Sequence, residues 1–335
     1  SEQPELNWRN PEVERRMRFV YVMDPMDRLA PDKDTTVAFQ RAAQRRGHQA
    51  LHCEPADLFV KGGDAFARVR EVTLREGGGA FFAVGAPAVV ALADVDAVFI
   101  RKDPPFDQAY LYATLLLERA RGRTVLVNDP RGLRDANEKL FALHFAEHTP
   151  RTLVTADRDT VFAFVEEVGG TAVIKPLDGA GGAGVLVLAK GDKNARSIVD
   201  LLTAEGRRLA MVQEFLPRVV EGDKRVLLLD GAILGAINRV PRGDDVRSNI
   251  HVGGRVEPCE VTAEERAMIT SLMPRLREHG LYFVGLDVIG GRLTEVNVTS
   301  PTGIQELSQH LGRDVAEDVI AWTEQQARAL RAGRA

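Results

Sequence analysis

The sequence predicts an α/β protein whose C-terminal half has an α+β arrangement. From residue 19 to about residue 129, short apolar strands alternate with helical stretches, a pattern typical of a mostly parallel sheet covered by helices. Farther along, two pairs of strands are joined by glycine-rich turns, which favours hairpins. At 335 residues and 44% hydrophobic, the chain is long enough for two or three packed units. We expect three units, over residues 17–138, 139–209 and 210–330, after a flexible extension over residues 1–16.

The first unit carries the alternating elements. Strands are expected at residues 18–23, 48–53, 96–100 and 124–128, and helices at 35–46 and 109–122. The most apolar stretch, "AFFAVGAPAVVALADVDAVFI", is broken by Pro87, Asp94 and Asp96. It is therefore not interpreted as a membrane span.

The second and third units mix strands and helices. Residues 133–150, "LRDANEKLFALHFAEHTP", are expected to form a helix that Pro150 ends. In the second unit we expect strands at 152–156, 171–175 and 184–190, and helices at 159–168 and 195–206. In the third unit we expect strands at 209–215, 224–230 and 232–240, an irregular stretch at 241–255, a helix at 263–280 and a hairpin within 285–301.

Charge and cysteine content limit the partners. Lys and Arg number 44 against 48 Asp and Glu, a formal net charge of −4, so no overall basic field is available to hold nucleic acid or an acidic membrane. The two cysteines are too few for a disulfide framework, and the polar start of the sequence lacks the order of a secretory signal. We therefore expect a cytoplasmic protein that binds no nucleic acid or membrane and that holds anions locally.

The glycine loop "GAGGAG", residues 179–184, has the form of a dinucleotide-binding fingerprint. That fingerprint needs a strand before it and a helix after it, but here the strand-like "VLVLAK" follows. A hairpin with a glycine tip fits better. Glycine lets backbone N–H groups converge on an anion, and Lys175 adds a positive charge just before the loop. We interpret the loop as a lid over phosphates, the alternative being a merely flexible turn.

The hairpin "GLDVIGGRLTEVNVTSP" carries three oxygen-bearing side chains, Asp287, Glu295 and Asn297. A two-residue turn at the glycines would place Asp287 opposite Thr294, with the two acids on different faces. A three-residue loop over 290–292 pairs Asp287 with Glu295 and Ile289 with Leu293 instead, and puts Asn297 on the same face. We favour the second geometry. Two carboxylates and an amide, without His or Cys, suit Mg²⁺ held partly by phosphates; the alternative is a solvent-facing polar strand.

Five motifs together resemble the bacterial glutathione synthetase pattern within the ATP-grasp superfamily. They are "VMDP", "RKDPPFD", "IKPLDGAGGAGV", "EGDKRVLLLDG" and "VGLDVIGGRLTEVNVTSPTG". The resemblance runs from about Met17 to Glu324. It implies an ATP-grasp fold made of an N-terminal parallel-sheet domain, a lid subdomain and a C-terminal antiparallel-sheet subdomain, with ATP between two sheets and Mg²⁺ or Mn²⁺ as the metal.

The resemblance also assigns site residues. The nucleotide site takes Lys139, Lys175, Asp178, Gly179, Gly181, Gly182, Gln213, Glu214, Phe215, Leu216 and Asp223, in which the two lysines hold phosphates and residues 213–216 lie beside adenine. The metal ligands are Asp287, Glu295 and Asn297. Arg225, Arg239 and Arg255 lie near the reacting groups.

The implied reaction transfers the γ-phosphate of ATP to a carboxylate of γ-glutamylcysteine, and the amine of glycine then displaces phosphate to give glutathione. A carboxylate acylates poorly, so phosphorylation supplies a leaving group, and a metal and cationic side chains neutralise charge. One stretch departs from the family's "RGNLAAGGRGEP": here it reads "RSNIHVGGRVEP". A ligase with a different acceptor and a catalytically silent nucleotide-binding protein are the alternatives. The resemblance further suggests a homo-oligomer, with a tetramer as the expected form.

Overall fold

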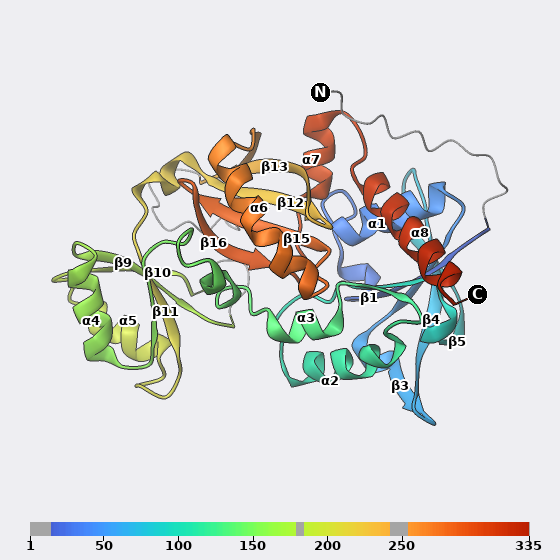
Figure 1. The fold of residues 1–335 in the computed structure, drawn as a ribbon, viewed down its shortest axis with the longest axis horizontal. Coiled ribbons are helices and arrows are strands. Elements are labelled where there is room, and N and C mark those ends of the chain that lie inside the picture. Colours follow the sequence, from blue (N-terminus) through green and yellow to red (C-terminus); the bar gives the residue numbers. More distant parts are fainter. Residues whose placement is uncertain (1–14, 179–183, 242–253, 335) are drawn as a thin grey trace.

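The computed structural model describes residues 15–178, 184–241 and 254–334. Three sheets organise these residues, and Figure 1 shows the second sheet with its helices standing apart on the left of the body formed by the other two. Within the described ranges, no helix is long and apolar enough to cross a membrane.

The first sheet has seven strands, in the order β3-β4-β2-β1-β6-β7 with β5 on β4. Their bounds are β1 Arg18–Val22, β2 Gln49–Cys53, β3 Leu58–Lys61, β4 Asp64–Leu74, β5 Phe82–Ala91, β6 Ala97–Ile100 and β7 Val125–Val127. Strands β2, β1, β6 and β7 are parallel, as predicted, but β3, β4 and β5 are antiparallel additions that the sequence analysis did not identify. Short connections produce them, because a parallel pair would need a long crossover.

Helices of the first unit begin at side-chain caps. They are α1 Thr35–Arg45, α2 Gln108–Leu117 and α3 Pro130–Asp135, and their first turns are capped by Asp34, Asp107 and Asp129. Each carboxylate accepts a backbone N–H that the helix itself leaves without a partner.

The prediction of a single helix over residues 133–150 is wrong. Helix α3 ends at Asp135, and only a short 3-10 helix, Phe141–Phe145, follows. The cause is Asn137, whose Oδ1 accepts the N–H groups of Lys139 and Leu140, both at 3.0 Å. Such local side-chain bonds compete with helix formation.

The second sheet is antiparallel throughout, in the order β10-β9-β11-β8. Its elements are β8 Thr152–Thr155, α4 Arg158–Glu167, β9 Thr171–Pro176, β10 Leu186–Ala189, α5 Ala195–Leu202 and β11 Ala210–Glu214. Strand β11 pairs with β8 and β9, although the expected boundary at residue 210 assigns it to the third unit. We therefore propose that the second unit extends to Glu214.

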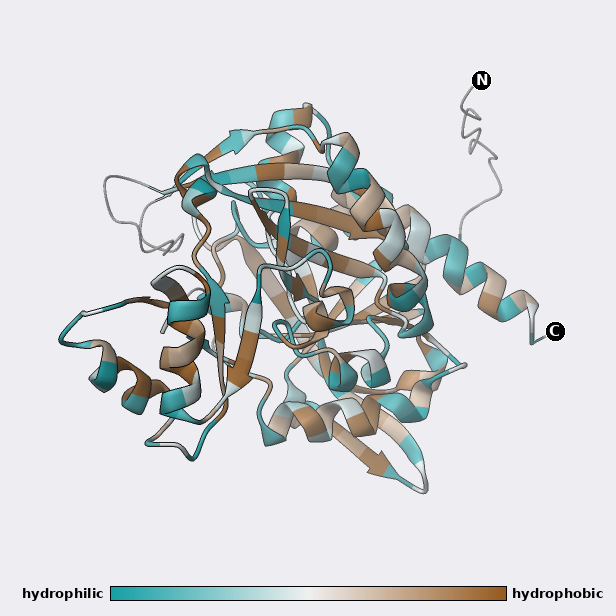
Figure 2. Ribbon diagram, turned by 60° about the vertical axis from the view of Figure 1, so that its left-hand side comes forward, coloured by the Kyte–Doolittle hydropathy of each residue, from teal (hydrophilic) through white to brown (hydrophobic). Residues whose placement is uncertain are grey.

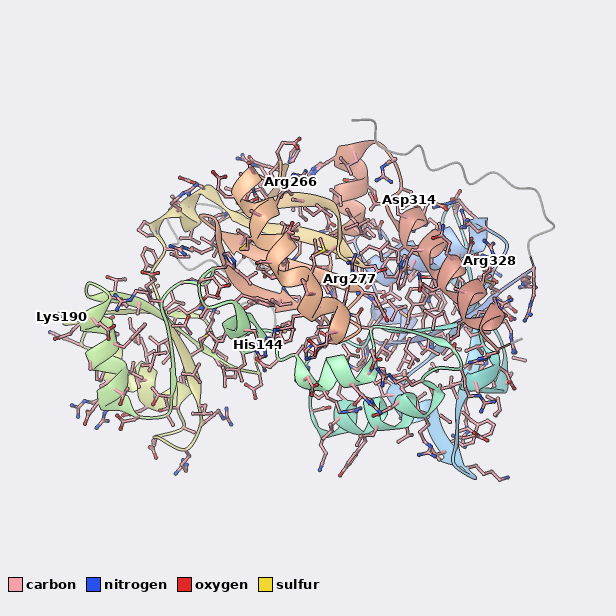
Figure 3. All side chains as sticks on the ribbon, in the orientation of Figure 1. His144, Lys190, Arg266, Arg277, Asp314 and Arg328 are labelled. Atoms are coloured by element: carbon pink, nitrogen blue, oxygen red, sulfur yellow. The ribbon has the colours of Figure 1, made fainter. Side chains whose placement is uncertain are left out.

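The third sheet has the order β14-β13-β12-β15-β16. Its elements are β12 Asp223–Leu229, β13 Ala232–Val240, β14 Arg255–Pro258, α6 Ala263–Glu278, β15 Phe283–Ile289, β16 Arg292–Asn297, α7 Ile304–Leu311 and α8 Ala316–Ala332. Apolar residues of α6 pack on one face of this sheet, among them Met268, Ile269 and Leu272, while Arg266 and Arg277 are exposed on the helix (Figure 3). On the other face, Leu227, Leu229 and Phe283 pack toward the first unit, and polar side chains such as Asp223 and Arg225 line the cleft described below.

The cores explain how the units are joined. Two buried clusters each combine side chains of the first and third sheets, whereas the second sheet has a cluster of its own around Val161, Ile174 and Val212. Helix α8 returns to the first unit and packs beside α1. Figure 2 shows the same division, with apolar strands inside and polar turns outside. The second unit is thus a separately packed body beside a fused pair.

Candidate active site

The β15–β16 hairpin pairs Asp287 with Glu295, as predicted, but its turn and register differ from those expected. Its turn is the two-residue Gly290–Gly291, with φ of 55° and 77°, and Ile289 pairs with Arg292. The expected three-residue loop and the pairing of Ile289 with Leu293 are therefore wrong. A bulge shifts the register between Asp287 and Val288. The extra residue of a bulge shifts the pairing of the two strands by one residue. Asp287 is therefore paired with Glu295.

Asp287 lies between two arginines. Its Oδ1 accepts a hydrogen bond from Nε of Arg225 at 2.7 Å and lies 3.1 Å from an NH2 nitrogen of Arg239. The same nitrogen of Arg239 is 3.1 Å from Asp223. Burial favours the neutral acid, but the two guanidinium groups outweigh it and hold the pKa of Asp287 well below its usual range.

Asp223 has the opposite shift. Burial raises its pKa to about 7 despite the charge of Arg239, and one of its oxygens, Oδ1, has no hydrogen-bond partner among the described residues. Two carboxylates near one pair of guanidinium groups differ in this way because Asp287 has the closer cationic contacts.

Glu295 and two buried lysines form the next group. Nζ of Lys139 lies 3.6 Å from Oε1 of Glu295. Burial lowers the pKa of Lys175, against the attraction of Glu295. Glu138, which the sequence analysis did not identify, also lines this region, and burial followed by the charge of Glu295 raises its pKa to about 7. Its only sequence signal is its place before Lys139 in "NEK".

All of these groups except Lys139 line one cleft of about 450 Å³ between the second and third sheets. The predicted residues on its walls are Lys175, Gln213, Glu214, Phe215, Leu216, Asp223, Arg225, Arg239, Asp287, Glu295 and Asn297. Apolar Val173, Val185 and Val187 of the second sheet face it as well. The cleft therefore combines an apolar wall, the end of β11 and a charged floor.

Three predicted residues that the structure describes, Lys139, Arg255 and Asp178, are not among the residues that line the cleft. Arg255 begins β14, has a side chain that is 67% exposed, and pairs with Glu257. Asp178 is exposed at the border of the described region. Gly179, Gly181 and Gly182 lie outside the described residues, as do Ser248 and His251 of the departing stretch.

Further lining residues belong to two of the quoted motifs, "RKDPPFD" and "VGLDVIGGRLTEVNVTSPTG", but were not named individually as site residues. Asp103 and Pro104 reach the cleft from the first unit, and Thr299, Ser300, Pro301 and Thr302 follow β16. The "VNVTSPTG" stretch was noted for one metal-ligand candidate, Asn297, but which of its other residues face the cleft depends on how the chain leaves the strand.

The donor set fits a hard divalent cation. Asp287, Glu295 and Asn297 line the same cleft, and Asn297 donates its amide N–H to Gly285 O at 3.1 Å, so its side-chain oxygen is the atom suited to a metal. In the described part of the chain, no three His, Cys, Asp or Glu side chains are grouped closely enough to hold an ion alone. Such an incomplete oxygen set suits Mg²⁺, which usually keeps waters and phosphate oxygens as ligands.

Two family models cover most of the chain. The prokaryotic glutathione synthetase N-terminal domain matches residues 17–134, and the prokaryotic glutathione synthetase ATP-grasp domain matches residues 138–312. The chain belongs to the prokaryotic glutathione synthetase family. It is an ATP-grasp ligase with ATP as its co-substrate, and its α/β fold is the ATP-grasp fold.

Relatives in this family are similar over nearly their whole length. The glutathione synthetase of Synechocystis sp. is 45% identical over 323 residues, which cover 92% of this chain and 100% of that protein. The glutathione synthetase of Agrobacterium fabrum is 44% identical over 294 residues, 88% of this chain and 92% of that protein.

Solved structures confirm the fold. The D-cycloserine synthetase DcsG superposes with a TM-score of 0.62 at 18% identity, over 93% of this chain and 99% of the other. The ATP-grasp ligase PsnB, complexed with a precursor variant, Mg and ADP, gives a TM-score of 0.61 at 20% identity, over 92% and 98%.

Proposed function

We propose that the chain catalyses the ATP-dependent ligation of γ-glutamylcysteine and glycine to glutathione, with ADP and phosphate as the other products. The observation that carries the proposal is the cleft itself. It places Asp287, Glu295 and Asn297 on one wall, with Lys175 and residues 213–216, at the end of β11, on the facing wall. Membership of the glutathione synthetase family supports this choice of substrates.

Each group has a role in this proposal. Lys139 and Lys175 hold phosphate oxygens, and residues 213–216, together with the apolar wall of Val173, Val185 and Val187, hold the adenine. Asp287, Glu295 and Asn297 hold Mg²⁺ or Mn²⁺, which when bound neutralises phosphate charge. Arg225 and Arg239 stabilise charge on the reacting groups. Asp178, Gly179, Gly181 and Gly182 cover the phosphates, and Asp223 sets the position of Arg239, 3.1 Å away.

The chemistry needs no protein nucleophile. A carboxylate oxygen of the dipeptide attacks the γ-phosphorus of ATP, ADP leaves, and an acyl phosphate forms. The amine nitrogen of glycine then attacks the carbonyl carbon, phosphate leaves, and the nitrogen loses a proton. The cleft must exclude water between these steps, because the acyl phosphate hydrolyses readily.

The decisive experiment measures ADP release with γ-glutamylcysteine in the presence and absence of glycine, with product analysis across a panel of amino acids. We expect glutathione and ADP in equal amounts with glycine. Ligation of another amine in preference to glycine would support the alternative of a different acceptor. No phosphate release with any substrate would contradict the proposal and support a silent nucleotide-binding protein.

We also propose a homo-oligomer, with a tetramer as the expected form, in the cytoplasm, where the ATP that the reaction consumes is available. Family resemblance supports the oligomer, and light scattering on the purified chain tests it. A monomer at working concentration would contradict it.

A further inference from the structure

The residues that follow β16 form one wall of the cleft, and side chains from other elements hydrogen-bond to this wall. Residues Asn297, Thr299, Ser300, Pro301 and Thr302 line the cleft. Between the first two, Val298 is fully buried. The position of this wall decides where the side-chain oxygen of Asn297 lies.

Asn128 makes the contact that holds the wall. It directly follows β7 in the first sheet and is 3% exposed. Its Nδ2 donates to Phe283 O at 2.9 Å and to Val298 O at 2.7 Å. Its Oδ1 accepts from Tyr282 N at 2.8 Å and Phe283 N at 2.9 Å. All four hydrogen-bonding positions of the carboxamide are thereby used.

All four bonds go to the two ends of one hairpin. The β15–β16 ladder has its last pair at Gly285 and Asn297. In the same register Phe283 would face Thr299, but its N–H and C=O bond to the Asn128 carboxamide instead. The side chain thus stands in for a strand backbone at the open end of the hairpin, opposite the Gly290–Gly291 turn. It ties the residue after Asn297 to the start of β15.

Two further side chains donate hydrogen bonds to backbone carbonyl groups of the same wall. Arg101, which follows β6 and is buried, donates to Pro301 O at 2.9 Å. Arg225 donates to Thr302 O at 3.1 Å. Carbonyl groups of the wall are therefore bonded at residues 298, 301 and 302. The first unit supplies two of the three donors, so the first sheet acts as a rigid support for the metal and phosphate wall.

We propose that Asn128 is a positioning residue for the ligation reaction: it fixes Asn297, and the wall that follows it, in the place where they meet the metal and the phosphates. The inference rests on the proposed function. An apolar residue of the same size would leave buried backbone groups of Phe283 and Val298 without partners. Groups that orient a metal ligand commonly change metal affinity or activity by about 10–100-fold when removed.

The test compares Asn128→Ala with Val125→Ala. Val125 begins β7, is buried, and belongs to a different apolar cluster from Val298, so its truncation destabilises the sheet and leaves the hydrogen bond to Val298 in place. For each protein we would measure thermal stability, Mn²⁺ binding in the presence of a non-hydrolysable ATP analogue by electron paramagnetic resonance, and kcat and KM for ATP.

We expect both variants to lose thermal stability, and only Asn128→Ala to weaken Mn²⁺ binding and lower kcat, each by about 10-fold or more, with a much smaller change in KM for ATP. Asn128→Ser, which keeps one polar group, should fall between Asn128→Ala and the parent, and serves if the alanine variant does not fold. Equal Mn²⁺ affinity in Asn128→Ala and Val125→Ala overturns the proposal. Because Mn²⁺ binding needs no peptide substrate, this result is separate from a failure of the proposed reaction.

Discussion

Arg225 donates from Nε to Oδ1 of Asp287 at 2.7 Å, and the side chains are only 7% and 8% exposed. Removing one partner of a buried ion pair leaves a charge without compensation, which commonly costs about 3–5 kcal/mol. We therefore expect Arg225→Met to lower the free energy of unfolding by about 3 kcal/mol, measured with urea, since Arg239 still faces Asp287. Arg225→Lys keeps the charge and should cost less. Equal stability of the methionine variant and the parent would contradict this account.

Glu295 is placed for charge more than for packing. Its side chain is 22% exposed in the cleft and lies 3.6 Å from Lys139. Glu295→Gln should lower kcat by more than about 100-fold, because a neutral amide is a poor ligand and does not balance the lysine. Stability should change by less than about 1 kcal/mol. The matched control is Glu257→Gln on β14, whose side chain pairs with Arg255 outside the cleft and whose activity should equal that of the parent. Comparable activity losses in the two variants would sink the assignment of Glu295.

The hairpin shows what sequence patterns can and cannot predict. The pairing of Asp287 with Glu295 followed from the requirement that three oxygen-bearing side chains share a face. The bulge that achieves it has no pattern of its own, because any residue can be the extra one in a strand. In the first sheet, the parallel strands were predicted from their apolar runs. Strand β5 was not, since its exposed "VGAPAV" lacks alternation.

Site residues divide in a similar way. Lys175 and the predicted acids and arginines on the cleft walls were found through motifs. Glu138 and Thr299–Thr302 were not named as site residues, because their exposure to the cleft depends on how chain segments cross. The helix expected over 133–150 failed for a local reason: Asn137 bonds its own following backbone. Arg255 matched a motif, yet its side chain lies among exposed groups.

Gly132 marks a close approach between the first and third units. It lies within α3, and a Cβ there would be 2.1 Å from His279 O and 2.9 Å from a methyl carbon of Leu281. Because backbone atoms cannot give way cheaply, Gly132→Ala should lower the free energy of unfolding by about 3 kcal/mol. Gly85→Ala is the control, since its Cβ would meet nothing closer than 3.6 Å. Differential scanning calorimetry on both variants decides the matter, and a Gly132→Ala protein as stable as the control would refute the close contact.

Glu324 fastens the C-terminal helix to the first unit. Its carboxylate accepts two hydrogen bonds from Arg46, at 2.6 and 2.8 Å, and lies 2.5 Å from Nε2 of His48. Nδ1 of His48 accepts the N–H of Met17 at 3.1 Å, so in the neutral ring Nε2 carries the proton and donates to Glu324. Burial alone would raise the pKa of Glu324, but the hydrogen bonds from Arg46 and His48 lower it from 4.5 to about 2.

This lowered pKa predicts how stability depends on pH. The unfolded chain binds a proton at Glu324 below about pH 4.5, whereas the folded chain does so only near pH 2. The contribution of Glu324 is therefore complete above pH 4.5 and is lost as the pH falls toward 2. Glu324→Gln should lower the free energy of unfolding by about 3 kcal/mol at pH 7. In urea titrations, the difference in free energy of unfolding between this variant and the parent should become smaller between pH 4.5 and pH 3. Glu317→Gln, on the same helix but with a side chain that is 32% exposed, should lower the free energy of unfolding at pH 7 by less than Glu324→Gln does. If the difference in free energy of unfolding between Glu324→Gln and the parent does not shrink as the pH falls, the carboxylate contributes to the contact between α8 and the first unit by its shape and not by its charge.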